Sequence, residues 1–157
     1  VSRSLRPVLA RCEWSIRYDS AFAQVIRCCA ATPRRGQVGT WITPEMIKAY
    51  ERLHELGFAH SVEVWDQGDL IGGVYGVALG RAFFGESMFY RRANASKVAL
   101  VNLVRRLDAK GYELMDCQQQ TEHTARFGAQ PMQRSEFLDA LGEALCHATE
   151  RGPWVAD

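Results

Sequence analysis

Spacings typical of metal sites and disulfide frameworks are missing from this sequence. Its cysteines are Cys12, Cys28, Cys29, Cys117 and Cys146. The number is odd and no CxxC pair occurs, so reduced thiols in a reducing compartment are expected. Its histidines are His54, His60, His123 and His147. None has ligand spacing with a cysteine, so each is expected to be a polar surface or supporting residue, and no metal site is predicted.

Long apolar runs and a strong charge excess are missing as well. No run approaches the ~18 residues of a membrane span, and no segment has the pattern of a secretion signal. The formal net charge is only +1, so the charge of the whole chain does not indicate nucleic-acid binding. With no internal repeat or low-complexity segment, residues 1–157 are expected to form a single cytoplasmic domain with a sizeable core.

The patterns that are present predict alternating helices and strands. Helical spacing of apolar residues occurs in residues 21–31, 43–57, 94–111 and 135–148. Strand-like patterns occur in residues 15–20, 60–66, 70–79, 82–90 and 112–117. Thr43 and Ser135 are the expected N-caps of their helices, and Gly57 is the expected end of the second helix.

The order of these elements predicts an α+β fold with a mixed sheet. The three consecutive strands within residues 60–90 are expected to form an antiparallel meander. The helix over 94–111 then connects strand 82–90 to strand 112–117 as a crossover, so these two strands are expected to run parallel.

Glu86 is unusual because it lies inside an otherwise apolar strand. Strict alternation would place it on the face of Phe84 and Met88, with Phe83 and Phe89 on the other. A carboxylate beside large apolar groups must be paired, hydrogen-bonded or functional, unless it lies at a solvated edge.

Two polar side chains, Asp116 and Gln118, end the last strand. Strands of mixed sheets present ligand-binding groups beyond their carboxyl ends, where this pair could hold and deprotonate an amine. The alternative is that Asp116 only starts a turn. Trp41 poses a similar choice, between a hydrophobic staple on Ile47 and a flat surface for stacking a base.

Basic residues surround the turn before the helix over 94–111. Arg91, Arg92 and Lys97 lie where a helix N-terminus favours anions, so the turn binds phosphate or is simply a solvated basic surface. Arg105, Arg106 and Lys110 predict further basic surface.

The ordered motifs GTWIT, GESMF, NASK and DCQ resemble the bacterial leucyl/phenylalanyl-tRNA–protein transferases, over about residues 2–148. The resemblance implies a GNAT-like acyltransferase fold. It also implies an aminoacyltransferase that moves Leu, Phe or Met from aminoacyl-tRNA to proteins with N-terminal Arg or Lys, which marks them for N-degron degradation. No metal or coenzyme is implied, because the aminoacyl ester is itself the activated donor.

The resemblance also assigns roles to residues. Asp116 and Gln118 match the catalytic pair, and Glu86 matches a residue that places the aminoacyl-adenosine and the acceptor. Trp41 and Thr121 match positions beside the terminal adenosine. The walls of an apolar pocket for the donor side chain match Val74, Phe83, Met88, Leu103 and Met115. Arg91, Arg92 and Lys97 become candidates for tRNA phosphate contacts.

Two alternatives remain open, and departures from the family pattern motivate the first. The family's usual N-terminal domain is not part of these 157 residues, and Thr121 stands where the family usually has Asn. One alternative is a catalytically weakened or idle relic that only binds tRNA or peptide N-termini. The other is a CoA-dependent acetyltransferase of the same fold, although RRANAS at the helix start has no glycine to form a pyrophosphate cradle.

Overall fold

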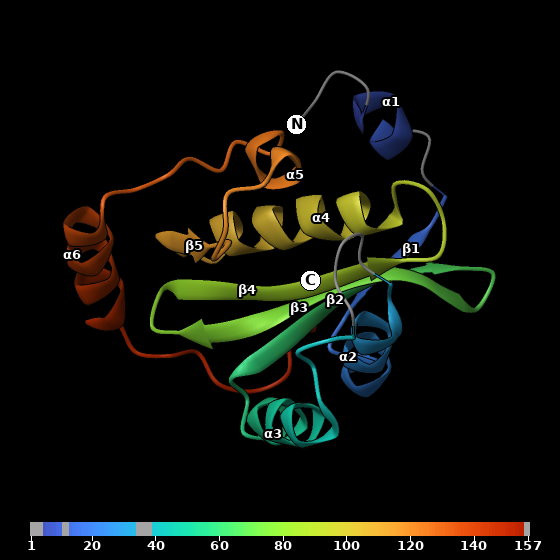
Figure 1. The fold of residues 1–157 in the computed structure, drawn as a ribbon, viewed down its shortest axis with the longest axis horizontal. Coiled ribbons are helices and arrows are strands. Elements are labelled where there is room, and N and C mark those ends of the chain that lie inside the picture. Colours follow the sequence, from blue (N-terminus) through green and yellow to red (C-terminus); the bar gives the residue numbers. More distant parts are fainter. Residues whose placement is uncertain (1–4, 11–12, 34–38, 156–157) are drawn as a thin grey trace.

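The sheet at the centre of the molecule has five strands in the order β1-β2-β3-β4-β5. A computed structural model describes residues 5–10, 13–33 and 39–155 (Figure 1). The strands are β1 (Ser15–Tyr18), β2 (Ala59–Asp66), β3 (Asp69–Leu79), β4 (Ala82–Tyr90) and β5 (Leu114–Asp116). β1 to β4 pair antiparallel, and β5 pairs parallel to β4. Both the predicted meander and the parallel crossover are therefore confirmed.

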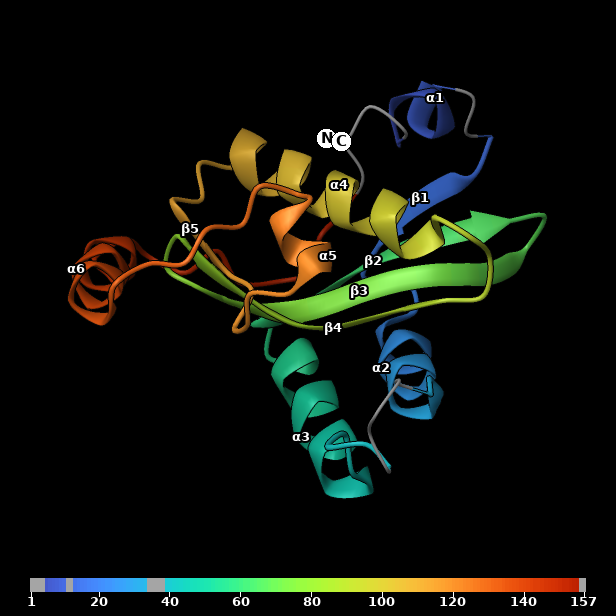
Figure 2. The same ribbon diagram turned by 45° about the horizontal axis from the view of Figure 1, so that its top comes forward.

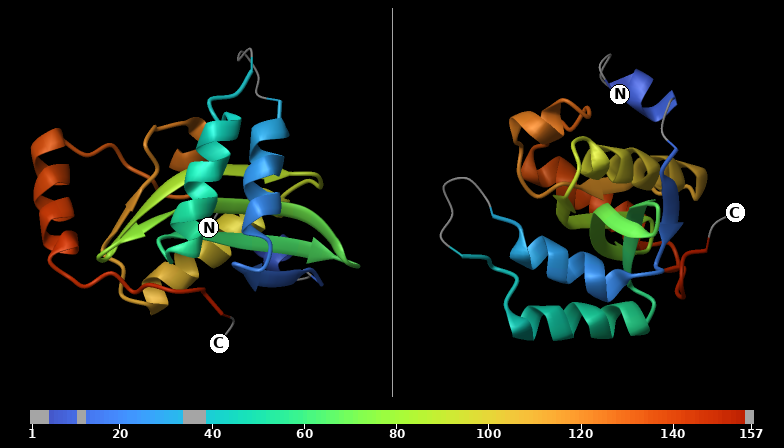
Figure 3. Two further views of the ribbon diagram at one scale, coloured as in Figure 1. Left: turned by 90° about the horizontal axis from the view of Figure 1, so that it is seen from below. Right: turned by 90° about the vertical axis from the view of Figure 1, so that its right-hand side faces the viewer.

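Helices cover both faces of this sheet. They are α1 (Leu5–Ala10), α2 (Phe22–Ala31), α3 (Pro44–Glu55), α4 (Ala95–Ala109), α5 (Glu122–Ala125) and α6 (Arg134–Leu145). α4 lies on one face, and α2 and α3 lie side by side on the other (Figures 2 and 3). α6 stands beyond the β5 edge (Figure 1). The sequence patterns did not predict the short helices α1 and α5.

Helix boundaries follow the capping chemistry of the sequence. The Thr43 side chain accepts a hydrogen bond from the Met46 N–H, and Pro44 occupies the first turn of α3, as predicted. The prediction that Ser135 caps the last helix is wrong. α6 begins after Gln133, whose N–H donates to the Glu136 carboxylate at 3.3 Å, and Ser135 lies inside the first turn.

The two faces of the sheet bury separate apolar cores. The core on the α4 side includes Val74, Phe83 and Leu103. The core on the α2 and α3 side includes Tyr75 and Phe89. α2 buries the stripe that its spacing predicts, namely Phe22, Val25, Ile26 and Cys29.

Two residues expected at the surface are buried. Arg106 is 8% exposed, and its guanidinium lies over the rings of Tyr18 and Trp154, so only Arg105 and Lys110 of the predicted basic group are exposed. His60 is 1% exposed and its Nδ1 lies 2.8 Å from the Asp19 carboxylate. Local periodicity does not reveal that Arg106 and His60 are buried, because the residues they contact come from distant segments of the chain.

Neither a cluster of possible metal ligands nor a membrane-spanning helix occurs in the described part of the chain. No group of three or more His, Cys, Asp or Glu residues there could hold a metal ion. No helix there combines the length and the apolar character that a membrane crossing requires. Cys12 and the side chain of His123 lie outside the described residues.

Candidate functional site

A β-bulge in β4 sets the direction of Glu86. Gly76 of β3 pairs with Gly85, but the preceding Tyr75 pairs with Ser87, so Glu86 is the extra residue. Alternation therefore shifts by one at this point. Phe83 packs in the α4-side core and Phe89 in the opposite core, so the prediction that they share a face is wrong.

The carboxylate of Glu86 interacts with Tyr50 of α3. Burial, the negative charge of Glu86 and a hydrogen bond to its carboxylate together raise the pKa of the Tyr50 hydroxyl well above its ordinary value. Tyr50 therefore stays protonated and donates to Glu86. The ring of Trp41 meets that of Tyr50 edge-on, with centroids 6.4 Å apart, and Trp41 remains 40% exposed.

The end of β5 brings Asp116 and Gln118 to the same place. Asp116 pairs with Phe84 at the last step of the parallel ladder. Its Oδ1 accepts the Gln118 N–H at 2.6 Å, and Gln118 has a left-handed φ of 61°. Asp116 therefore starts a turn, which leaves its chemical role open, and the strand ends one residue earlier than the sequence indicated.

This turn carries the Gln118 side chain back over β4. Its Nε2 donates to the Gly85 carbonyl at 3.2 Å and to Glu86 Oε2 at 3.0 Å. Both partners are acceptors, so they fix which end of the amide is the NH₂ group. Asp116, Gln118 and Glu86 are thus brought together, as a turn and a bulge rather than as one regular strand face.

The predicted donor-pocket walls all belong to the α4-side core. Val74 is 3% exposed, and Phe83 and Leu103 are each 1% exposed. Met88 and Met115 are half-buried and pack against the same cluster. Their common location supports a shared apolar environment, and their contact with a donor side chain stays a prediction.

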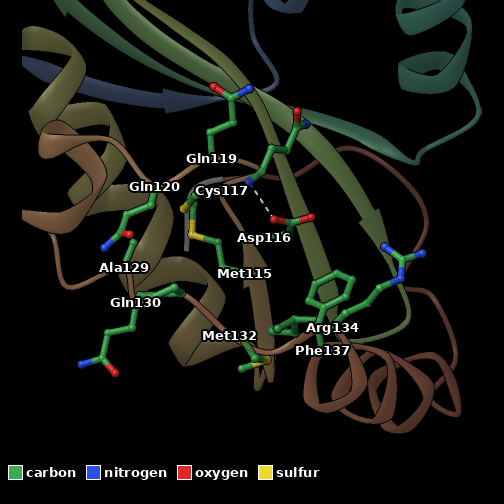
Figure 4. A pocket seen from close by; sticks show the side chains of 13 residues that line it. Met115, Asp116, Cys117, Gln119, Gln120, Ala129, Gln130, Met132, Arg134 and Phe137 are labelled. Carbon is green, nitrogen blue, oxygen red and sulfur yellow. Dashed lines mark hydrogen bonds between the residues drawn. The ribbon is translucent and has the colours of Figure 1, made fainter.

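An open cavity of about 460 Å³ lies beside the end of β5 (Figure 4). Of the predicted site residues, Met115, Asp116 and Gln118 line it. The other lining residues are Leu114, Cys117, Gln119, Gln120, Ala129, Gln130, Pro131, Met132, Arg134 and Phe137. Sequence reasoning missed the wall formed by residues 129–137, because nothing in its local pattern indicates that it folds back onto β5.

Comparison with known proteins identifies the family. The family model described as "Leucyl/phenylalanyl-tRNA protein transferase" matches residues 1–142. The chain belongs to this family. Proteins named leucyl/phenylalanyl-tRNA–protein transferase are 56% identical over 155 residues in Myxococcus xanthus and 55% identical over 158 residues in Nitrosospira multiformis. These alignments cover 99% and 100% of this chain, but 66% and 67% of the relatives, so the chain spans about two thirds of their length.

Two solved structures with a similar fold are named as acetyltransferases. An aminoglycoside acetyltransferase from an uncultured soil metagenomic sample, in complex with sisomicin, matches with a TM-score of 0.55 and 12% identity over 76% of this chain and 91% of that one. A ribosomal-protein-alanine N-acetyltransferase from Brucella melitensis matches with a TM-score of 0.50 and 13% identity, over 76% and 95%. They confirm the predicted GNAT-like fold.

Thr121 caps α5. Its hydroxyl accepts the Thr124 N–H at 3.1 Å, and the Thr124 hydroxyl accepts the Thr121 N–H at 2.9 Å. This reciprocal pair stabilises the short helix that follows the turn at Asp116 and Gln118. A contact between Thr121 and an adenosine stays a prediction.

The basic residues in the β4–α4 turn and in the first turn of α4 each have a partner within the protein. Arg91 donates to the Cys28 sulfur at 3.3 Å, and Arg92 forms an ion pair with Asp66. Lys97 donates to the Asn94 side chain at 3.1 Å. Arg91 and Arg92 are exposed despite these contacts, so their contact with tRNA phosphate stays a prediction.

Gly76→Ala should distort the bulge and destabilise this domain. A Cβ at this position would lie 2.2 Å from the Phe84 carbonyl oxygen and 2.6 Å from the Phe83 ring, so the backbone of β4 must move. We expect a loss of about 1–3 kcal/mol, as for other overpacked sites, measured by urea unfolding. Gly142→Ala is the matched control, because its Cβ meets nothing within 4 Å in α6, and helix propensity predicts a gain of about 0.5–1 kcal/mol. Equal effects of the two variants would contradict the bulge argument.

Proposed function

We propose that this protein is an aminoacyltransferase of the cytoplasm. It transfers Leu, Phe or Met from aminoacyl-tRNA to the α-amine of proteins that begin with Arg or Lys, which marks those proteins for N-degron degradation. The observation that carries the proposal is the meeting of Asp116, Gln118 and Glu86 at the β4–β5 edge in a chain that belongs to this transferase family.

The reaction requires a neutral amine beside an activated ester. The amine nitrogen bonds to the carbonyl carbon while the ester bond to the terminal ribose breaks, and the proton lost by the amine restores the ribose hydroxyl. Asp116 has one oxygen occupied by the turn and a second that can attract the amine proton. Gln118 directs its NH₂ group at Glu86, which leaves its carbonyl oxygen to orient the amine.

The acidic and aromatic side chains near this turn suit the protein acceptor and the aminoacyl-tRNA donor. Glu86 and Asp116 form an acidic spot for the Arg or Lys side chain of the acceptor. Trp41, which is 40% exposed above Tyr50, offers a ring on which the terminal adenine can stack. Met88 and Met115, which pack against the α4-side core, would contact the donor side chain.

A transfer assay tests the proposal. The full-length gene product is mixed with tRNA charged with radiolabelled Leu or Phe and with peptides that begin with Arg, Lys or Ala. We expect label on the Arg and Lys peptides and none on the Ala peptide. No label on any peptide would overturn the proposal. Binding of a tRNA acceptor-end mimic without transfer would then favour the idle relic.

A CoA-dependent acetyltransferase is the second candidate, because two solved structures of similar fold are named as acetyltransferases. The turn before α4 argues against it, since residues 91–94 contain no glycine and Asn94 takes the left-handed position, with φ of 70°. We expect calorimetry to detect no binding of acetyl-CoA. Micromolar binding, together with acetylation of an amine, would favour this candidate over aminoacyl transfer.

A further inference from the structure

The cavity beside β5 continues directly from the reactive pair. Asp116 and Gln118 line it, and the same two residues form the turn on which the proposed reaction depends. Its other wall is the segment that leads into α6, with Met132, Arg134 and Phe137. In Figure 4 the side chains of Met132 and Phe137 lie beyond Asp116, on the side away from Gln119. A molecule that reacts at Asp116 can therefore extend along this wall.

The lining of the cavity suits a peptide backbone. Gln119, Gln120 and Gln130 are among the residues that line it, and a carboxamide can both donate and accept a hydrogen bond, as a peptide unit requires. Met132 and Phe137 add an apolar surface to the same cavity, and Met132 is 51% exposed. A few fixed polar groups over an apolar surface are typical of binding pockets of this volume.

The charge of the lining argues against an RNA occupant. Among the described residues that line the cavity, Asp116 is the only carboxylate and Arg134 the only guanidinium, so their charges cancel. A groove that follows a phosphate backbone is instead strongly basic. The exposed arginines of the β4–α4 turn lie at the other end of β4, outside this cavity.

We propose that this cavity binds the acceptor polypeptide beyond its N-terminal residue. The first peptide units hydrogen-bond to the glutamines, and an apolar side chain at the second or third position packs between Met132 and Phe137. Arg and Lys remain the requirement at the first position, and this wall adds a preference for the side chains at the next two positions. The proposal rests on the proposed aminoacyl transfer and specifies its acceptor.

Acceptor kinetics with matched variants test the proposal in the full-length protein. The variants are Met132→Ala and Phe137→Ala, with Leu138→Ala as control, because Leu138 is 50% exposed on α6 and does not line the cavity. The acceptors are Arg-Leu-Phe-Gly-Gly and Arg-Gly-Gly-Gly-Gly. For the first peptide we expect KM to rise about tenfold in each cavity variant, as for a lost apolar contact, with kcat and the KM for aminoacyl-tRNA unchanged. For the glycine peptide we expect wild-type KM in every variant.

The outcomes separate this inference from the proposed function. If the wild-type protein transfers Leu but both cavity variants keep the wild-type KM for Arg-Leu-Phe-Gly-Gly, the inference is wrong and the function stands. A raised KM for aminoacyl-tRNA in the cavity variants would indicate that the cavity binds the tRNA end, and this result would also overturn the inference. If the wild-type protein transfers nothing, fluorescence anisotropy of a labelled Arg-Leu-Phe-Gly-Gly peptide measures acceptor binding directly. Weaker binding by Met132→Ala than by the wild type supports acceptor binding in the cavity. Unchanged binding rejects it. Since Met132 is half-exposed, its variant remains informative if Phe137→Ala fails to fold.

Discussion

Asp116→Asn should lower kcat for aminoacyl transfer by about 10²–10⁴-fold, the range expected for loss of a group that positions or accepts a proton. Asn retains a side-chain oxygen that can accept the Gln118 N–H, which Asp116 Oδ1 accepts at 2.6 Å, so the turn should persist. The substitution therefore removes the negative charge and little else. Single-turnover transfer of radiolabelled Leu to an Arg peptide measures the effect, and urea unfolding verifies that stability is unchanged.

The control for this variant is Asp139→Asn. It removes the same charge from an exposed position of α6 that does not line the cavity, so transfer should stay within about twofold of wild type, consistent with the small effects of exposed charges. Asp116→Ala adds a second comparison, because it removes the turn acceptor as well and should also lower stability. Wild-type kcat in Asp116→Asn would exclude this carboxylate from proton transfer and leave it only the role of a turn residue.

Local patterns predicted the long helices and the strands of this fold, because each of these elements is set by nearby residues. The stripe of α2 and the Thr43 cap of α3 appear in the structure as the sequence indicates. The parallel pairing of β5 with β4 also follows from connectivity, since a crossover helix separates them.

Long-range contacts explain where the predictions failed. Whether Glu86 lies on one face or the other depends on the register between β3 and β4, and Gly76 opposite Gly85 fixes that register. Arg106 is a surface cation by its local sequence, but the chain end supplies the Val155 carbonyl as its acceptor at 2.9 Å. No periodicity within β4 or α4 contains these partners.

The candidate site shows the same division. Asp116, Gln118 and Glu86 stand out as polar residues within or just after apolar strands, so their chemistry made them candidates. The family resemblance then supplied roles that the residues themselves left open. The far wall of the cavity, with Met132 and Phe137, could not be predicted, because residues 129–137 reach β5 only through tertiary folding.

Trp154→Ala should destabilise the protein by about 3–5 kcal/mol, the range for truncating a large buried aromatic side chain. Trp154 is 7% exposed. Its ring stacks on His60, with centroids 4.2 Å apart, and its backbone N–H donates to Asp19 at 2.6 Å. The guanidinium of Arg106 lies 5.1 Å from the same ring. Loss of the ring therefore leaves a cavity beside a buried histidine and a buried arginine.

The urea unfolding midpoint measures this loss, and Val155→Ala is its control. Val155 is 66% exposed and the substitution retains the backbone carbonyl that Arg106 contacts, so a change within about 0.5 kcal/mol is expected. A small effect of Trp154→Ala would show that the chain end does not contribute to the core. A large effect explains why this segment returns to the sheet: it covers the His60–Asp19 pair, whose buried polar atoms require the Trp154 backbone N–H and the stacked ring to remain shielded from water.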